Sequence, residues 1–416
     1  MIRSNRSKIV FIALLFVVIF SLFTFGNYQF SRTNPGGSDF LVHWVGTREL
    51  VLNGASPYSD EVALKIQTAA YGRPARSNEH ELRVAYPLYS IILFLPFSLI
   101  ADFIFARAIW MTVLEFGLFA LVFVLLRVTN WKPKRMTLIF LLLFVVFWYH
   151  GMRPLINGNA VIIVTLLLSA GLLALRNGEQ ELAGVLFAFS TIKPQVVVIP
   201  LAFLFFWSLY RKKYRLIGWM IGTVALLSAA ASLIIPDWII QNLREVLRYP
   251  LYNPPGTLQD CLKVWFPGAG GRLGLAVTVG LSLLLLVEWW HNRKGDFQAF
   301  LWLFSLTLVC SVWIGIQTDP GNFIVLLPAM FFIFSFWEDR WKKKGVLLTL
   351  GVLLLITVSI WVIFITSLEV TYQPIQSPIM FLPLPALLFP LLYWIRWWCV
   401  KPPTVWYEQV YKIENP

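Results

Sequence analysis

Long apolar segments, separated by short polar ones, recur along the whole chain. Helices of about 20 apolar residues match the ~30 Å hydrocarbon core of a bilayer. The pattern predicts an all-α polytopic membrane protein with a single transmembrane domain over residues 1–399 and a short polar tail at 400–416. About twelve membrane-spanning helices are expected, near residues 9–26, 104–126, 137–150, 159–175, 182–192, 196–210, 214–235, 273–290, 297–316, 321–337, 345–368 and 379–399.

Two apolar segments fit a single crossing poorly. The segment 86–100 is short and interrupted by proline, and runs of this length are often interfacial or re-entrant. The segment 181–210 is too long for one span and carries Lys193 near its middle, so we expect a hairpin of two short helices there. This threading leaves two large outer segments, 27–103 with interfacial or re-entrant helices, and 236–272.

Charged residues are few and unevenly placed. They make up 13% of the chain, with a net charge of +13, whereas a soluble domain carries roughly 25%. Clusters of basic residues in short segments between apolar runs are typical of cytoplasmic loops, so this charge does not indicate a nucleic-acid partner. We expect a multi-pass plasma-membrane protein with both termini cytoplasmic. The clusters lie at residues 3–8, 127–135, 211–215, 293–294 and 340–344.

A carboxylate stands just outside the first predicted span. Asp39 follows a Pro-Gly-Gly turn and opens an apolar segment that stops at Gly54. Ser38 or Asp39 is a suitable N-cap for a helix, and this helix would be amphipathic and rest on the membrane surface. The helix dipole would keep the carboxylate ionised. Asp39 is therefore either only a cap or a base that accepts a proton from a bound hydroxyl group.

Further polar residues stand at the predicted outer ends of spans. Lys193 lies in an otherwise apolar stretch, where a lysine either extends to the membrane surface or binds an anion. Arg153 is placed similarly, and His150 precedes it by three residues; a histidine alone is more often interfacial than catalytic. The remaining candidates would also serve as ordinary turn and capping residues: they are Asn159, Asp319 and Asn322.

The sequence lacks the common motifs for nucleotide and metal chemistry. It contains no Gly-rich nucleotide-binding motif, no metalloprotease or serine-hydrolase motif, and no Asp-x-Asp pair. An Asp-x-Asp pair usually holds a divalent metal on a nucleotide sugar, so we expect neither a metal nor another cofactor. Aromatic residues make up 16% of the chain, and those in outer loops could stack on sugar rings.

These residues together resemble glycosyltransferase family 87, a branch of the GT-C membrane glycosyltransferases. The resemblance covers roughly residues 30–340, and it rests on the order and placement of several short motifs. The motifs are Ser38-Asp39-Phe40 with Trp44, Gly46 and Leu52-Asn53-Gly54-Ala55-Ser56-Pro57-Tyr58, then Tyr86-Pro87-Leu88, Asn157-Gly158-Asn159, Ala183-Gly184 with Lys193-Pro194, and Leu326-Leu327-Pro328.

The resemblance implies a GT-C fold and an active site on the outer membrane face. It implies inverting transfer of a hexose, with mannose favoured, from a polyprenyl-phosphate donor to a hydroxyl of a lipid or glycolipid, without a metal. Asp39 matches the catalytic aspartate, which would act as the base. Lys193 and Arg153 would bind the phosphate that leaves. The substrate-binding candidates are His43, Trp44, Tyr58, Tyr86, His150, Asn159, Asp319 and Asn322.

The sequence departs from the family pattern at two positions. Leu88 stands where a second proline is common, and Asn322 stands where a histidine is common. The second polar contact to the substrates is therefore open, with His43 and His150 as substitutes, and the sugar could differ from mannose.

Two other classes of function remain to be compared with an enzyme. A transporter or flippase of lipid-linked saccharides would carry repeated halves and polar, broken helices near the bilayer midplane, whereas this chain has no evident repeat and gathers its ionisable residues at one face. A non-catalytic assembly subunit would leave the Asp39 turn unexplained. The sequence therefore favours a glycosyltransferase, and it gives no prediction of oligomeric state.

Overall fold

A computed structural model describes residues 2–77, 79–252, 256–316, 318–370 and 374–400 of the chain. Most of these residues are helical, and the strands described are β1 (Glu369–Val370) and β2 (Pro374–Ile375), which form one short antiparallel pair. The all-α prediction is confirmed. The predicted tail at 400–416 lies outside the described residues, except for Val400.

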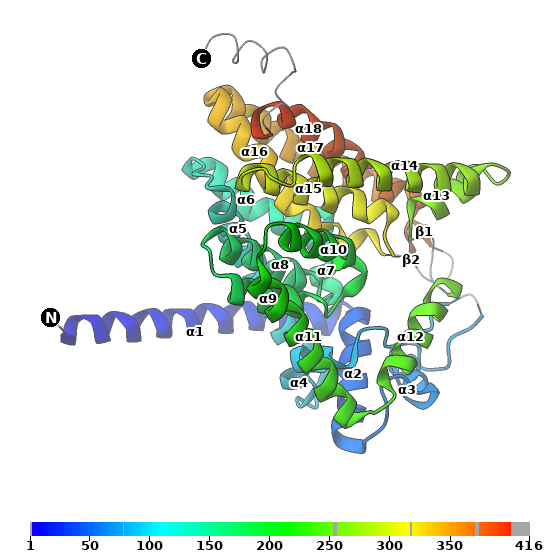
Figure 1. Ribbon diagram of the computed structural model, residues 1–416. Coiled ribbons are helices and arrows are strands. Elements are labelled where there is room, and N and C mark those ends of the chain that lie inside the picture. Colours follow the sequence, from blue (N-terminus) through cyan, green and yellow to red (C-terminus); the bar gives the residue numbers. More distant parts are fainter. Residues whose placement is uncertain (1, 78, 253–255, 317, 371–373, 401–416) are drawn as a thin grey trace, which may run out of the picture.

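The described helices follow one another with short connections (Figure 1). They are α1 (Ile2–Thr33), α2 (Ser38–Asn53), α3 (Asp60–Tyr71), η1 (Leu88–Ser90), α4 (Ile91–Ser98), α5 (Phe103–Thr129), α6 (Arg135–Phe147), α7 (Tyr149–Asn157), α8 (Val161–Arg176), α9 (Gln180–Ser190), α10 (Pro194–Tyr210), α11 (Tyr214–Ile234), α12 (Trp238–Arg248), η2 (Tyr249–Leu251), α13 (Leu258–Trp265), α14 (Gly270–His291), α15 (Phe297–Ile314), η3 (Pro320–Leu326), α16 (Leu327–Trp341), α17 (Lys343–Ser367), η4 (Pro378–Phe381) and α18 (Pro383–Cys399), where η marks a 3₁₀ helix.

Eight helical segments among the described residues are long and apolar enough to cross a membrane. The pair α6 and α7, bent by 48° at Trp148, gives a ninth if it is counted as one broken span. The chain is thus a polytopic membrane protein. Three further predicted spans are the shorter helices α8, α9 and α10, of 16, 11 and 17 residues, so the count of twelve stays a prediction.

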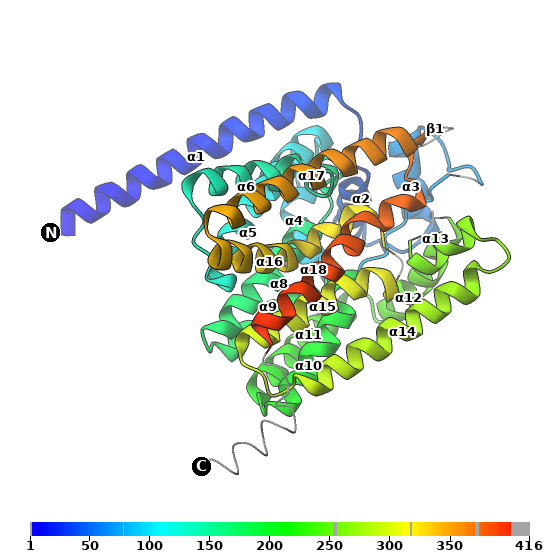
Figure 2. The ribbon, with the colours of Figure 1, turned by 90° about the horizontal axis from the view of Figure 1, so that it is seen from above.

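The predicted cytoplasmic loops contact one another at one end of the bundle. Arg176 donates a hydrogen bond of 3.0 Å to the carbonyl of Arg127, and Arg211 donates one of 3.1 Å to the carbonyl of Lys294. The Arg176 guanidinium also lies 5.7 Å from the ring of Phe297. Helices α2, α3, α12 and α13 lie at the opposite end (Figures 1 and 2). The bundle therefore has a basic end and a second end that carries the longer connections.

Helix α1 extends away from the body of the molecule (Figure 1). Near its C-terminal end Asn27 donates to Thr112 at 3.1 Å and to Glu115 at 2.8 Å, which fastens α1 to α5. Towards its N-terminus the apolar side chains stand free, with Ile9 65% and Phe11 66% exposed. Such an exposed apolar surface is typical of a helix that contacts lipid or another protein, which agrees with the predicted first span.

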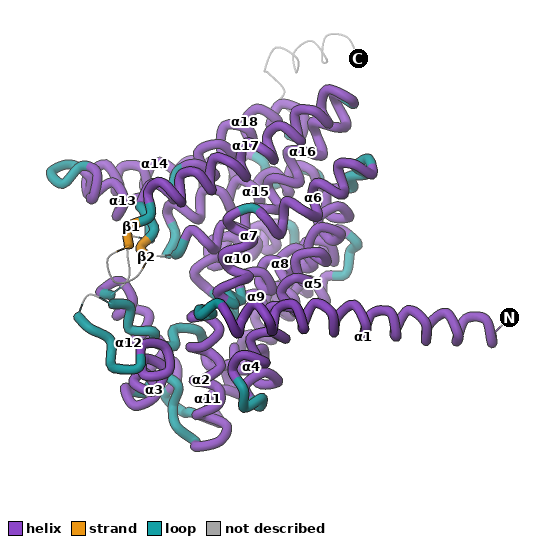
Figure 3. Tube along the Cα trace, turned by 180° about the vertical axis from the view of Figure 1, so that it is seen from behind, coloured by secondary structure: helices purple, strands orange, loops and turns teal. Residues whose placement is uncertain are grey.

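Residues 27–103, the predicted first outer segment, include several short helices packed against the bundle (Figure 3). The prediction that α2 is an amphipathic helix resting on the membrane surface is wrong. Four consecutive residues, Phe40 to His43, are buried. Since successive residues turn by about 100°, the first half of the helix is covered on all sides, and only its C-terminal end, with Val51 and Leu52, is exposed. The predicted stop is confirmed, because Gly54 ends α2 with φ of 66°. Segment 86–100 forms η1 and α4, too short to span a bilayer.

Candidate active site

The Gly36-Gly37 turn places Asp39 in the first turn of α2. The N-cap is Gly37, in the left-handed region with φ of 78°, and no side chain caps the helix. The interpretation of Ser38 or Asp39 as the N-cap is therefore wrong. The Asp39 carboxylate instead accepts a hydrogen bond of 2.9 Å at Oδ2 from Nδ2 of Asn159, which lies 120 residues further along the chain.

The turn between α7 and α8 packs directly beneath α2. Gly158 has φ of 70°, and a Cβ atom there would lie 2.5 Å from Cβ of Phe40. The carbonyl of Gly158 accepts a 2.7 Å hydrogen bond from Nε1 of Trp110, whose ring stacks on Phe40. Only glycine permits this close approach in a left-handed conformation. The close packing brings Asn159 to Asp39.

Lys193 lies in the turn between α9 and α10 and is 3% exposed. Its ammonium group donates to Oδ1 of Asn159 and to Oδ1 of Asn322, both at 2.6 Å. It also lies 5.4 Å from the centre of the Tyr86 ring. Extension of Lys193 to the membrane surface is therefore excluded. Asp39, Asn159, Lys193 and Asn322 form one continuous hydrogen-bonded chain, which we call the Asp39–Lys193 network.

A second ion pair lies beside this network. Arg153 Nη2 is 3.0 Å from Oδ2 of Asp319, and both side chains are partly exposed. Asp319 also caps η3 through the backbone N–H of Gly321 at 2.5 Å and accepts from Nε2 of Gln376 at 3.0 Å. The expected capping role of Asp319 is thus present, together with an ion pair. Arg153 is held by a carboxylate, so an anion would share it with Asp319.

Tyr86 connects the network to the first outer segment. Its ring centre lies 4.0 Å from that of His43, which stacks at 4.5 Å on Phe94. Its carbonyl accepts a 2.7 Å hydrogen bond from the hydroxyl of Tyr58. His43, Tyr58 and Tyr86 are all buried, so these rings form one wall beside Lys193.

Two predicted site residues have other contacts. Trp44 donates from Nε1 to the carbonyls of Phe97 and Ile100 at 3.1 and 3.2 Å, and so fastens α2 to the end of α4. His150 is 1% exposed and lies among aromatic rings, those of Trp148, Tyr149 and Phe323. Neither residue joins the Asp39–Lys193 network.

The ionisable groups of the site influence one another. Burial raises the pKa of Asp39, although Lys193 opposes the rise. Burial lowers the pKa of Lys193 to about 8, opposed by Asp39 and Asp319. Burial would raise the pKa of Asp319, but Arg153 and its hydrogen bonds outweigh it and the pKa is lowered. Burial lowers the pKa of His43 to about 3, which leaves its ring neutral.

Two residues near the site were missed by the sequence analysis. Arg107 in α5 is 2% exposed and donates to the carbonyls of Asn34 and Ile156 at 2.8 and 3.1 Å. A charged residue within a predicted span is a functional candidate by itself, so a signal was present. Gln376, which contacts Asp319, stands in a short polar loop and gave no such signal.

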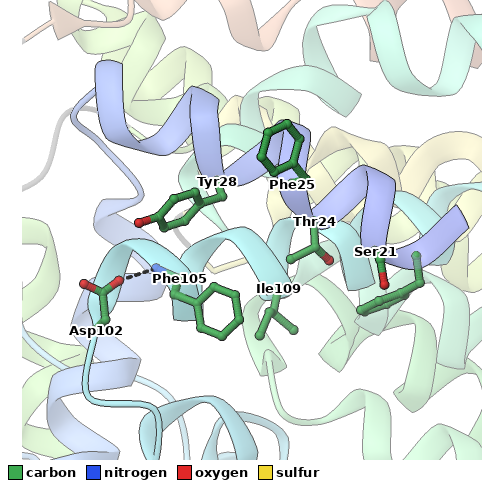
Figure 4. Close-up of a pocket in the computed structure, with 8 residues that line it drawn as sticks. Ser21, Thr24, Phe25, Tyr28, Asp102, Phe105 and Ile109 are labelled. Atoms are coloured by element: carbon green, nitrogen blue, oxygen red, sulfur yellow. Dashed lines mark hydrogen bonds between the residues drawn. The ribbon is translucent and has the colours of Figure 1, made fainter. Parts of the chain in front are cut away.

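No group of three or more His, Cys, Asp or Glu side chains within the described part of the chain could hold a metal ion. An open groove of about 640 Å³ lies between α1 and α5 (Figure 4). Apolar side chains line most of it, with Tyr28 and Asp102 at one end. No member of the Asp39–Lys193 network lines this groove.

Comparison with known proteins gives one match. The model of glycosyltransferase family 87 matches residues 85–311, which is more than half of the chain. The match includes Tyr86, Arg153, Asn159 and Lys193, whereas Asp39 precedes it. No curated protein and no solved structure matches the chain. The sequence-based resemblance is confirmed at the level of the family, and the chain is a membrane glycosyltransferase that belongs to glycosyltransferase family 87.

Proposed function

We propose that the protein transfers a hexose, namely mannose, from a polyprenyl-phosphate donor to a hydroxyl group of a lipid or glycolipid. The reaction takes place at the outer membrane face and inverts the configuration at the anomeric carbon, with Asp39 as the base. The observation that carries the proposal is the Asp39–Lys193 network. It holds a carboxylate and an ammonium group in fixed positions on two sides of Asn159.

Asp39 has the properties that a general base requires. Asn159 orients one carboxylate oxygen, and no hydrogen bond among the described residues engages the other. Burial raises the pKa of Asp39, which makes the carboxylate a stronger base than a free aspartate. We propose that the second oxygen accepts the proton of the acceptor hydroxyl, whose oxygen attacks the anomeric carbon while the C–O bond to the phosphate breaks on the opposite side.

The leaving phosphate gains negative charge as that bond breaks. A buried cation fixed near the phosphate stabilises this charge more strongly than a solvated one. Lys193 meets this need, because two amide oxygens hold its ammonium group in place. Arg153 provides a second cation next to it, shared with Asp319. Resident metal ions have no part in this mechanism.

The proposed orientation places this site at the outer face. The basic loops occupy the opposite end of the bundle, where Arg176 and Arg211 bind neighbouring loops. Basic loops favour the cytoplasmic side, so both termini would be cytoplasmic. The alternative function, transport or flipping of lipid-linked saccharides, has no feature of the site in its favour and is at odds with membership of a glycosyltransferase family.

The Asp39→Asn variant tests the proposed function. Purified protein in lipid nanodiscs would receive polyprenyl-phosphate mannose and extracted membrane lipids, and glycolipid formation would be measured with and without EDTA. Loss of the base should lower the rate about 10²–10⁴-fold, and EDTA should have no effect. Asp102→Asn is the matched control, because Asp102 lies at the same end and only caps α5.

Undiminished transfer by Asp39→Asn would refute the assignment of the base. Loss of wild-type activity in EDTA would refute the metal-free mechanism. If the wild-type protein transferred glucose or galactose but not mannose from the corresponding polyprenyl phosphates, the sugar assignment would be wrong while the reaction class remained.

A further inference from the structure

Helix α12 has two faces of opposite character. It lies beside α3 at the end of the molecule that carries the site (Figures 1 and 3). One face carries a row of apolar side chains spaced four residues apart: Ile239 is 55% exposed, Leu243 55% and Leu247 70%. Ile240, 65% exposed, extends the same face. In water such a row would be unfavourable.

The other face of α12 is polar and binds the first outer segment. Gln241 accepts a 2.6 Å hydrogen bond from the hydroxyl of Ser56. Asn242 donates from Nδ2 to the carbonyls of Ala85 and Tyr86, at 3.0 and 3.1 Å.

One turn further along α12, Glu245 forms a buried ion pair of 2.5 Å with Nε of Arg83. Gln241, Asn242 and Glu245 of the polar face are thus bound to protein groups. The side chains of the apolar row, in contrast, stay more than half exposed among the described residues.

The chain position of α12 indicates what covers this row. It follows α11, a candidate membrane span whose last residues, Leu233 and Ile234, are 89% and 61% exposed. Only three residues separate α11 from α12. The exposed apolar end of α11 is therefore close in the chain to the apolar row of α12. A helix with one apolar and one polar face is suited to lie in the membrane interface.

We propose that α12 is an interfacial helix whose apolar row, Ile239, Ile240, Leu243 and Leu247, inserts among the acyl chains of the surrounding phospholipid leaflet, and that α12 thereby holds Tyr86 in its place beside Lys193. The second half of this proposal rests on the proposed function. The connection is short, because Asn242 binds the carbonyl of Tyr86, whose ring lies 5.4 Å from the Lys193 ammonium.

Site-directed nitroxide labelling tests the position of α12. Cysteine would be introduced at Leu247 or at Arg244, which is also exposed; the native cysteines are buried and so react poorly with the label. In phosphatidylcholine nanodiscs the label at position 247 should collide with oxygen, which concentrates in lipid, and the label at 244 with a water-soluble nickel chelate. Preferential collision of the label at 247 with the nickel chelate would overturn the proposal. Protection from both reagents would also overturn it, since a protein partner or a second copy would then cover the row.

Transfer assays test the connection to the site. Two variants are compared with the wild type: the double variant Leu243→Ser/Leu247→Ser and the single variant Asn242→Leu. Each should lower the transfer rate about tenfold, because small displacements of groups in the site reduce the rate. Leu275→Ser on α14 is the matched control, as Leu275 is 57% exposed and remote in the chain from α12, and it should have no effect. Full activity of Asn242→Leu would refute the connection. If wild-type protein transferred no sugar at all, the proposed function would fail, whereas the nitroxide result would still decide the position of α12.

Discussion

Replacement of Arg107 by methionine tests how the Asp39 turn is held in position. The guanidinium of Arg107 binds the carbonyl of Asn34, which precedes the Gly36-Gly37 turn, and the carbonyl of Ile156, which precedes Asn159. It is 2% exposed and has no carboxylate partner among the described residues. Arg107 therefore joins the two segments that bring Asp39 and Asn159 together.

The expected changes in stability and in activity differ. Methionine removes the hydrogen bonds to two partly buried carbonyls, at a cost of about 0.5–1.5 kcal/mol each. It also removes a buried cation that lacks a counter-charge, whose burial costs several kcal/mol. Because these contributions oppose each other, the free energy of unfolding should change little. A displacement of ~1 Å between reacting groups, however, lowers rates about 100-fold, so kcat of Arg107→Met should fall by about that factor.

The assay compares kcat, KM and thermal unfolding of Arg107→Met and Arg107→Lys in the same nanodiscs. Lysine can reach one carbonyl but cannot bridge two with a planar fork, so its kcat should be intermediate. Arg176→Met is the matched control, because Arg176 also binds two carbonyls, those of Arg127 and Val128, but at the basic end. Its kcat should equal that of the wild type. A normal kcat for Arg107→Met, or an equal loss in both methionine variants, would refute the positioning role.

Two further predictions concern pH and backbone geometry. The transfer rate should rise with pH through the raised pKa of Asp39, because the base must be deprotonated. It should fall above about pH 8, because Lys193 must be protonated to bind the phosphate. In Lys193→Arg this fall should move to higher pH, and an unchanged fall in the rate at alkaline pH would contradict the assignment. Gly158→Ala should lower thermal stability more than Gly178→Ala. Both glycines have positive φ, so alanine at either position costs about 1–2 kcal/mol of backbone strain, but only at Gly158 would the new Cβ atom lie 2.5 Å from a neighbour, Cβ of Phe40. Equal losses of thermal stability would contradict this packing.

Local patterns predicted the long apolar helices and the end of α2 at Gly54 correctly, because each depends on residues close together in the chain. The start of α2 was predicted wrongly, since its N-cap is Gly37. The burial of α2 was not predictable in this way. Part of its cover comes from a segment about 40 residues further along the chain, where Val84 lies against Gly46 and Tyr86 against His43.

The contacts of the site depend on residues far apart in sequence. Arg153 and Asp319 are separated by 166 positions, and Lys193 and Asn322 by 129. The sequence identified all four residues as candidates from their chemistry. It could not show that Arg153 is paired with Asp319, because ion pairing depends on how α7 and η3 pack together. The role of Asn159 as the bridge between Asp39 and Lys193 was equally hidden, since turn chemistry alone explained that residue.

The base and the phosphate-binding cation of the proposed mechanism are electrostatically one unit. Lys193 lowers the pKa of Asp39 while Asp39 raises that of Lys193, and Asn159 binds both side chains. A donor phosphate placed beside Lys193 would neutralise part of its charge and so weaken its hold on the pKa of Asp39. The carboxylate would then become more basic when the donor is bound, which is when a proton must be accepted. In the proposed mechanism, the buried network would thus link donor binding to activation of the acceptor hydroxyl without a conformational change.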